Sequence, residues 1–216
     1  NSNNGGESVP IGSLAGYSLR VDRVIFGTAN DDTLAGDVLF GYIDAREGND
    51  TVTGSDADEE ILGGAGDDTL IGGAGDDTLT DYQGTNILQG GAGDDLIDVS
   101  GGVSTATIDG GAGTDTVKVD ASTDWSNLTL TNVEVLDGSG ALLDLSVSDL
   151  IAKGFTTVRN MTLRLDPNLA SGGTLDISSL AGDVALRGTN QSDTLTGNAG
   201  DNRIYLLSDS QQGTGS

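Results

Sequence analysis

The 216-residue sequence contains no cysteine, no histidine and only 2 prolines, and aromatic residues make up 4% of it. The lack of cysteine excludes disulfides and thiolate metal sites, and the lack of histidine removes the usual imidazole ligand for zinc or copper. Few aromatic side chains together with 35 glycines argue against an ordinary globular core. Oxygen atoms are the ligands that remain for a metal ion.

Basic residues are scarce as well, since 9 Lys and Arg residues face 34 Asp and Glu residues, for a formal net charge of −25. A nucleic acid needs a basic surface, which excludes it as a partner, and an anionic membrane surface repels the chain for the same reason. No run approaches the roughly 20 apolar residues of a membrane helix, so we expect no membrane insertion. The start, Asn-Ser-Asn-Asn, resembles neither an initiator segment nor a signal peptide, and we expect a piece of a longer protein.

A nine-residue period dominates the first half of the chain. Eight consecutive units run from Gly27 to Asp98, and the eighth place of each unit is aliphatic: Leu34, Ile43, Val52, Ile61, Leu70, Leu79, Leu88 and Ile97. The clearest units read GGAGDDTLI (63–71), GGAGDDTLT (72–80) and GGAGDDLID (90–98). Each unit joins a glycine-rich turn that carries Asp to a short strand with one core side chain, and this pattern indicates a solenoid.

The period also places the acidic residues. We expect glycines at places one, two and four of a unit to adopt positive φ and turn carbonyl oxygens inward. Two units make one coil of 18 residues, so place-six residues of alternate units share a wall. One column then holds Asp32, Asp50, Asp68 and Asn86, and the other holds Gly41, Glu59, Asp77, Asp95 and, after a two-residue insertion within 99–109, Asp115. Carboxylate and carbonyl oxygens suit Ca²⁺, which predicts ions between facing turns.

These units, together with GGAGTDTVK (110–118), resemble the glycine-aspartate nonapeptides of RTX proteins, the calcium-binding repeats of type I secreted proteins. The resemblance covers 27–118 well, 188–205 partly and 119–187 hardly at all. It implies an all-β fold, a right-handed parallel β-roll or β-helix solenoid with Ca²⁺ in the turns. It also implies a chain that stays unfolded until it meets extracellular calcium.

The predicted metal ligands are of two kinds. The side-chain ligands are Asp32, Asp50, Asp68, Asp77, Asp95 and Asp115, with Asn86 and Glu59 as weaker members. The loop ligands are Gly63, Ala65, Gly66, Asp67, Gly72, Ala74, Gly75, Asp76, Gly90, Gly93, Asp94, Gly110 and Gly113. For place-five acids such as Asp67, the alternative is a solvent-facing side chain with a coordinating carbonyl. The best pairs are expected to be Asp77 with Asp95, Asp95 with Asp115, and Asp50 with Asp68, followed by Asp32 with Asp50.

Changes in pattern divide the chain into four segments. We expect a lead-in with a capping strand at 1–26, the repeat roll at 27–118, a β-helical extension with few metal loops at 119–187, and degenerate units with a polar tail at 188–216. Alternating apolar residues predict strands at 18–26, 128–137, 141–146, 161–166 and 174–178. One short helix is expected at 146–154.

Two functions stay open. The first is a non-catalytic, calcium-folded structural module of a secreted or cell-surface protein of the surface-layer or adhesin type. The second is the accessory domain of a secreted protease, lipase or polysaccharide-modifying enzyme whose catalytic domain lies elsewhere. Adjacent carboxylates such as Asp67 and Asp68 recur at every turn, which a single active site would not require, so no catalytic residue is expected. Besides calcium ions, the open partners are a second copy of the chain and a cell-surface glycan, for which Arg159, Arg164 and Arg187 are candidates.

Overall fold

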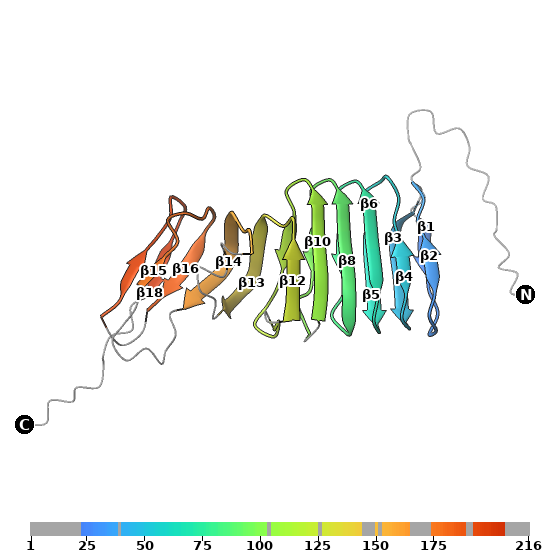
Figure 1. Cartoon of the computed structure of the whole chain (residues 1–216), viewed down its shortest axis with the longest axis horizontal. Helices are drawn as coiled ribbons and strands as arrows, with labels where there is room; N and C mark the ends of the chain where they lie inside the picture. The colour runs from blue at the N-terminus through green and yellow to red at the C-terminus, as the bar shows by residue number, and fades with distance from the viewer. Residues whose placement is uncertain are drawn as a thin grey trace, which may run out of the picture.

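A computed structural model describes residues 23–38, 40–102, 105–124, 127–143, 150, 153–164, 174–188 and 192–205. In these ranges the chain winds into an elongated β-solenoid, with the first and last strands at opposite ends (Figure 1). Every strand pairs in parallel with the strand of the next coil. The prediction of an all-β parallel solenoid is confirmed.

The strands form two long walls and one short sheet. The ten-stranded wall contains, in order, β1 (Arg23–Phe26), β3 (Phe40–Glu47), β5 (Glu60–Ala65), β7 (Thr78–Thr80), β9 (Leu96–Asp98), β11 (Thr116–Lys118), β13 (Val135–Leu143), β14 (Thr157–Arg164), β16 (Val184–Arg187) and β18 (Arg203–Tyr205). The six-stranded wall contains β12 (Leu128–Thr131), β10 (Thr105–Ala112), β8 (Thr85–Ala92), β6 (Thr69–Ala74), β4 (Thr51–Thr53) and β2 (Thr33–Ala35). The short sheet pairs β15 (Thr174–Asp176) with β17 (Thr194–Thr196).

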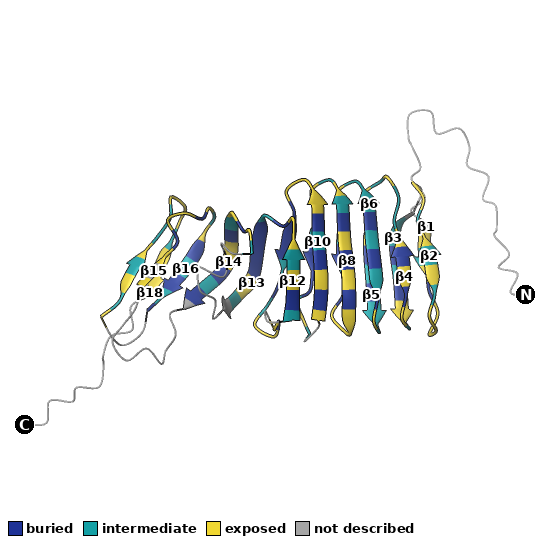
Figure 2. Ribbon diagram, viewed as in Figure 1, coloured by how far each residue is buried: buried dark blue, intermediate teal, exposed yellow. Residues whose placement is uncertain are grey.

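The eighth-place side chains form the core. On the six-stranded wall Val52 pairs with Leu70, and Leu70 pairs with Leu88, one coil apart each time. On the other wall Ile61 pairs with Leu79 in the same way. All five side chains are fully buried. Figure 2 shows buried residues as dark blue bands on the strands of both walls. Burying such a side chain contributes roughly 1.5–3 kcal/mol, which is why strands of three residues suffice when they stack.

The insertion in 99–109 lengthens one coil without changing the strand pairing. Leu88 pairs with Ile108, and Ile97 pairs with Val117. The extra residues lie between β9 and β10, where Ser100 and Gly101 form a turn. A turn absorbs added residues because no ladder hydrogen bond depends on its length.

The extension beyond 118 differs in detail from the prediction. The strand expected at 128–137 is wrong, because β12 ends at Thr131 and β13 begins at Val135 on the opposite wall. Asn132 lies between them with φ +50°, a conformation that Asn tolerates better than most residues. The helix expected at 146–154 lies mostly outside the described residues.

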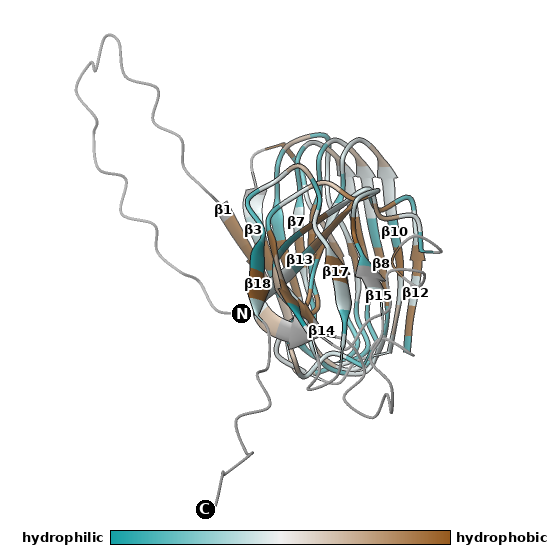
Figure 3. Ribbon diagram, turned by 90° about the vertical axis from the view of Figure 1, so that its left-hand side faces the viewer, coloured by the Kyte–Doolittle hydropathy of each residue, from teal (hydrophilic) through white to brown (hydrophobic). Residues whose placement is uncertain are grey.

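One apolar core runs through the solenoid from Ile43 to Leu186. The ten-stranded wall is continuous across residue 118, where the clear repeats end. Figure 3 looks along the solenoid and shows the coils stacked behind one another. Within the described ranges no helix has the length and apolar character needed to cross a membrane.

Candidate metal centre

The place-six residues stack in two columns, as predicted. In each column a place-six backbone N–H donates to the place-six side chain of the next coil. The first column joins Asp32 to Asp50 (2.7 Å), Asp50 to Asp68 (2.7 Å) and Asp68 to Asn86 (2.9 Å). The second column joins Glu59 to Asp77 (2.8 Å), Asp77 to Asp95 (2.8 Å) and Asp95 to Asp115 (2.9 Å). All four predicted pairs are therefore brought into direct contact.

Five of the place-six carboxylates have a second oxygen without a partner. The Oδ1 atoms accept the backbone hydrogen bonds, whereas the Oδ2 atoms of five place-six residues are buried and make no hydrogen bond: Asp50, Asp68, Asp77, Asp95 and Asp115. A buried carboxylate oxygen is costly unless a donor or a cation satisfies it. A repeated set of such atoms fits a series of bound cations.

The electrostatics of the columns lead to the same conclusion. Burial, together with the nearby carboxylates of Glu59 and Asp95, raises the pKa of Asp77 to about 7, against the lowering effect of the Glu59 N–H. Burial also raises the pKa values of the other four carboxylates, Asp50, Asp68, Asp95 and Asp115. A divalent cation would reverse these shifts by favouring the charged form.

Place-one glycines leave room for these oxygens. A Cβ added at Gly72 would collide with Oδ2 of Asp77 and lie 2.6 Å from the carbonyl oxygen of Gly90. A Cβ at Gly90 would likewise collide with Oδ2 of Asp95 and lie 2.6 Å from the carbonyl oxygen of Gly110. Place-one glycine therefore brings a carboxylate oxygen and a carbonyl oxygen close to one point.

The expected role of place one in backbone conformation is wrong. Glycines at place two, such as Gly73 (φ +123°), and at place four, such as Gly75 (φ +113°), do adopt positive φ, as predicted. The place-one glycines Gly63, Gly72, Gly90 and Gly110 are not among the positive-φ residues. Glycine at place one of these units leaves open the space beside the carboxylate that a side chain would fill.

The place-five acids form a separate, exposed ladder. Asp94 donates its N–H to Oδ1 of Asp76 (2.8 Å), and Thr114 donates to Oδ1 of Asp94 (2.8 Å). Asp67 receives the N–H of Thr85 (2.7 Å) in the same manner. These side chains are solvent-exposed and already accept backbone hydrogen bonds, which agrees with the part of the alternative that has them facing solvent.

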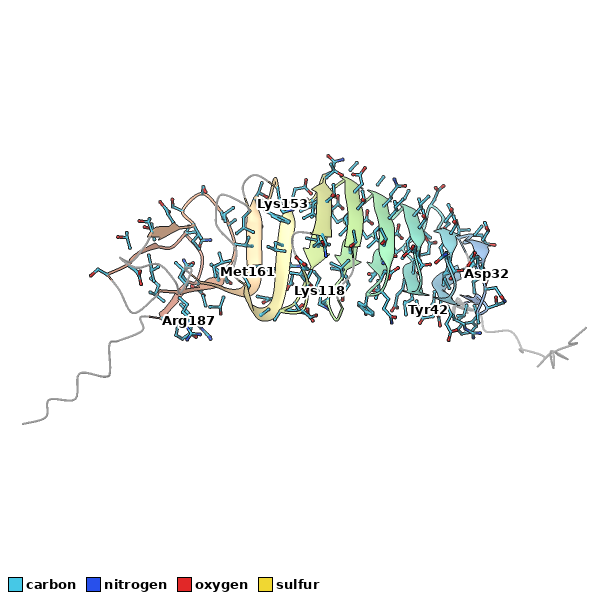
Figure 4. The ribbon with its side chains drawn as sticks, turned by 60° about the horizontal axis from the view of Figure 1, so that its bottom comes forward. Asp32, Tyr42, Lys118, Lys153, Met161 and Arg187 are labelled. Atoms are coloured by element: carbon cyan, nitrogen blue, oxygen red, sulfur yellow. The ribbon has the colours of Figure 1, made fainter. Side chains whose placement is uncertain are left out.

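Two turns satisfy their own carboxylates. Thr28 donates its N–H (2.6 Å) and its hydroxyl (2.8 Å) to Oδ2 of Asp32, which lies at the N-terminal end of the roll (Figure 4). Ser55 donates its N–H to Oε2 of Glu59 (3.0 Å) and its hydroxyl to Oε1. A place-two hydroxyl therefore supplies the partner that the five turns above lack.

Two further turns carry an amide at place six. Nδ2 of Asn202 donates to the carbonyl oxygens of Asn198 (2.9 Å) and Gly200 (2.8 Å) in its own loop. Nδ2 of Asn86 donates to the carbonyl oxygen of Gln83 (3.0 Å). The amide N–H groups bind carbonyl oxygens of their own loops and the amides carry no negative charge, so these turns need an ion less, although Oδ1 of Asn202 is buried without a hydrogen-bond partner.

Two acidic residues in the columns were not predicted. Glu134 accepts the N–H of Asp115 (3.0 Å) through Oε2 and thereby extends the second column beyond the repeats. No sequence signal marks it, because it follows Asp115 by 19 residues and lies outside the nine-residue frame. Asp81 occupies place one of its unit, 1% exposed, with Oδ2 unpartnered. The available sequence signal was an acidic residue at place one, where the clearest units have glycine.

The loop ligands predicted from sequence fall in two places. The turns hold Gly66, Asp67, Gly75, Asp76, Gly93, Asp94 and Gly113, whereas the ends of strands β5, β6, β8 and β10 hold Gly63, Ala65, Gly72, Ala74, Gly90 and Gly110. Among the described residues, no three or more acidic side chains converge into one metal-binding group. A site in this roll must then combine one or two carboxylates with backbone carbonyls, such as those of Gly90 and Gly110. This donor set is typical of Ca²⁺, which accepts carbonyl and carboxylate oxygens in flexible geometry.

Two basic side chains bind acids on the ten-stranded wall. Nζ of Lys118, labelled in Figure 4, lies 2.6 Å from Oδ2 of Asp98, and Nε of Arg159 lies 2.9 Å from Oδ2 of Asp137. The strand pairing places Asp98, Lys118, Asp137 and Arg159 next to one another in that order. Arg159 thus belongs to a ladder of alternating charge within the roll.

A parallel roll with stacked acidic glycine turns defines a calcium-binding solenoid. The model of the RTX calcium-binding nonapeptide repeat matches residues 42–70, 53–80, 71–106, 107–125 and 185–210, about half of the chain. The chain therefore belongs to the RTX calcium-binding repeat family, as the sequence resemblance predicted. A search of curated proteins gave no match.

Proposed function

We propose that the chain is a non-catalytic structural module of a secreted or cell-surface protein and that calcium drives its folding. The proposal depends on one observation, the five buried place-six oxygens that lack a hydrogen-bond partner. Bound calcium would supply the positive charge that these oxygens need. The unpaired carboxylates disfavour the folded state when the ion is absent.

The roll's own residues connect ion binding to folding. Oδ1 of Asp95 receives the N–H of Asp77, so the two coils are already in contact through this carboxylate. The other oxygen of Asp95 faces Gly90 and the carbonyl of Gly110. Because these groups come together only in the folded chain, binding free energy becomes folding free energy.

Membership of the RTX family supports an extracellular location. The chain has no cysteine, so its stability does not depend on disulfides. A net charge of −25 opposes compaction until cations bind. Both features suit a protein that folds after it reaches a calcium-rich medium.

Calcium titration tests the proposal. The far-ultraviolet circular dichroism of the chelated chain should gain a β signal as calcium is added, and magnesium at the same concentration should produce far less, since Mg²⁺ requires a tighter octahedral site. A chelated chain with the full β signal would refute calcium-driven folding.

A surface-assembly role is favoured over an accessory domain of an enzyme. The ten-stranded wall continues through β13, β14, β16 and β18 after the clear repeats end. A domain that only bound calcium would not need these additional strands. Electron microscopy with and without calcium distinguishes the two roles. Sheets or filaments that need calcium support assembly, whereas monomers under both conditions support the accessory role.

A further inference from the structure

Asp81 is the first residue of the unit 81–89 and stands where the clearest units have glycine. Its backbone N–H donates to the carbonyl oxygen of Asp98 (3.1 Å), which keeps the coil in register. Its Oδ1 accepts the N–H of Gln83 (3.1 Å). Its Oδ2 is buried without a hydrogen-bond partner, and the whole residue is only 1% exposed.

The unpartnered oxygen of Asp81 faces that of Asp68. A Cβ added at Gly63 would collide with Oδ2 of Asp81 and lie 2.8 Å from Oδ2 of Asp68. On the opposite column, the equivalent point beside Gly72 is shared by Oδ2 of Asp77 and the carbonyl oxygen of Gly90. Asp81 thus places a carboxylate where the neighbouring column has a backbone carbonyl.

The same unit lacks an acid at place six. Asn86 stands there, and its Oδ1 accepts the N–H of Asp68 (2.9 Å) while its Nδ2 donates to Gln83 (3.0 Å). The amide therefore completes the stacking of the column but adds no negative charge. Sequence alone marks this turn as the weakest of the first column.

We propose that Asp81 and Asp68 together bind a divalent cation, so that a place-one carboxylate restores the site that Asn86 would otherwise weaken. This inference rests on the proposed calcium-dependent function and assigns an additional side-chain ligand to it. Two unpartnered carboxylate oxygens balance the charge of one Ca²⁺ ion. A hard cation with oxygen ligands is the class that such a pair selects.

The competing arrangement is a carboxyl pair that shares a proton and binds no metal. In that case Asp81 would be a structural residue, and its charge would not affect calcium binding. The two arrangements differ in the number of ions that the chain binds.

The test compares the wild-type chain with Asp81→Asn and Asp58→Asn. Asp81→Asn keeps the size of the side chain and removes one carboxylate from the pair. Asp58→Asn is the matched control, because this exposed residue lies outside the predicted ligand set and needs only an acceptor oxygen for the N–H of Asp76. Equilibrium dialysis with calcium should show one fewer ion per chain for Asp81→Asn and no change for Asp58→Asn.

Terbium provides a local readout, because Tyr82 follows Asp81 directly and can sensitise the emission of a bound Tb³⁺ ion. Tyr82→Phe in the otherwise wild-type chain should reduce the sensitised emission, and Asp81→Asn should reduce it to the same extent. Should Asp81→Asn fail to fold, Asp81→Gly restores the residue of the other units and carries the same expected loss of one ion.

Equal calcium stoichiometry in the wild type and Asp81→Asn would overturn the Asp68–Asp81 site and favour the shared proton. A wild-type chain that binds no calcium would instead refute the proposed function as a whole. The two failures are therefore distinguishable in one dialysis series.

Discussion

The backbone N–H of Asp77 donates to Oδ1 of Asp95, 2.8 Å away in the next coil. The place-five ladder runs in the opposite direction, since Asp94 donates its N–H to Oδ1 of Asp76. Adjacent coils are thus connected twice per turn without any ion. The dependence on calcium comes from the other carboxylate oxygen of each place-six residue, the one that accepts no backbone N–H. The groups around that oxygen differ from turn to turn.

Asp77→Asn should convert an ion-dependent turn into an amide turn. The amide keeps an acceptor for the N–H of Glu59 and gains a donor, as Asn202 uses in its own loop. We expect the chelated protein to become more stable by about 1–3 kcal/mol, the usual cost of an unsatisfied buried group. The stabilisation by calcium should shrink, as measured by urea unfolding with and without calcium.

Asp32→Asn is the control for this change, because Thr28 already satisfies the carboxylate of Asp32. It should leave the calcium dependence nearly unchanged. Equal effects of the two substitutions would contradict the distinction between satisfied and unsatisfied turns.

Ser55→Ala should make the turn of Glu59 dependent on an ion. Glu59 is 3% exposed, and the substitution removes the hydroxyl that donates to its Oε1. The chelated protein should lose about 1–3 kcal/mol, because a buried carboxylate oxygen is left unpaired. Chemical unfolding in chelator measures the loss.

Ser122→Ala removes a hydroxyl that donates to Asp120 (2.5 Å) in a solvent-exposed hydrogen bond, and it is the control for Ser55→Ala. Water replaces the lost hydroxyl, so the stability of the Ser122→Ala protein should hardly change. If the two substitutions lowered stability equally, the burial of Glu59 would not explain the loss in the Ser55→Ala protein.

The chelated protein should be more stable at pH 5 than at pH 8. The pKa of Asp77 rises from 3.8 to about 7 in the folded state because of burial, so the folded state binds the proton more tightly than the unfolded state does. The stability of the chelated fold therefore decreases as pH rises from about 4 to about 7. Urea midpoints measured against pH in chelator check this, and a rise in stability with pH would contradict it.

Calcium binding should show the opposite dependence on pH, because the proton must leave before Asp77 can bind a cation. Calcium affinity should weaken as pH falls below about 7. In the Asp77→Asn protein, calcium affinity should change less with pH than in the wild type. Isothermal titration calorimetry at several pH values can measure the difference.

Gly90→Ala should remove calcium binding at the turn of Asp95. The added methyl group would collide with Oδ2 of Asp95 and lie 2.6 Å from the carbonyl oxygen of Gly110. We expect at least one ion fewer per chain in equilibrium dialysis. Gly41→Ala is the control, because a Cβ at Gly41 meets no atom within 4 Å, and it should bind as many ions as the wild type.

The period of nine allowed the core and the two acidic columns to be predicted from sequence. A coil of 18 residues brings Asp50 beside Asp68 whatever the rest of the chain does, because each parallel strand pairs with its counterpart one coil away. Asp115 could also be placed, since a two-residue insertion in a turn does not alter strand pairing.

Contacts between coils could not be read from the repeat. Glu134 completes a column from outside the nine-residue frame, and the segment 128–137 divides between two walls at a residue with positive φ. Both depend on where the chain bends after the repeats end, which no periodic signal specifies.

The sequence by itself determined the class of fold, the eighth-place core and the calcium chemistry, because all three follow from a local pattern repeated along the chain. Only the tertiary structure decided which turns need an ion. Asp95 and Glu59 occupy equivalent places in their units, yet one keeps a bare buried oxygen and the other binds Ser55. The difference arises from burial and hydrogen bonding around each oxygen, which exist only once the coils have stacked.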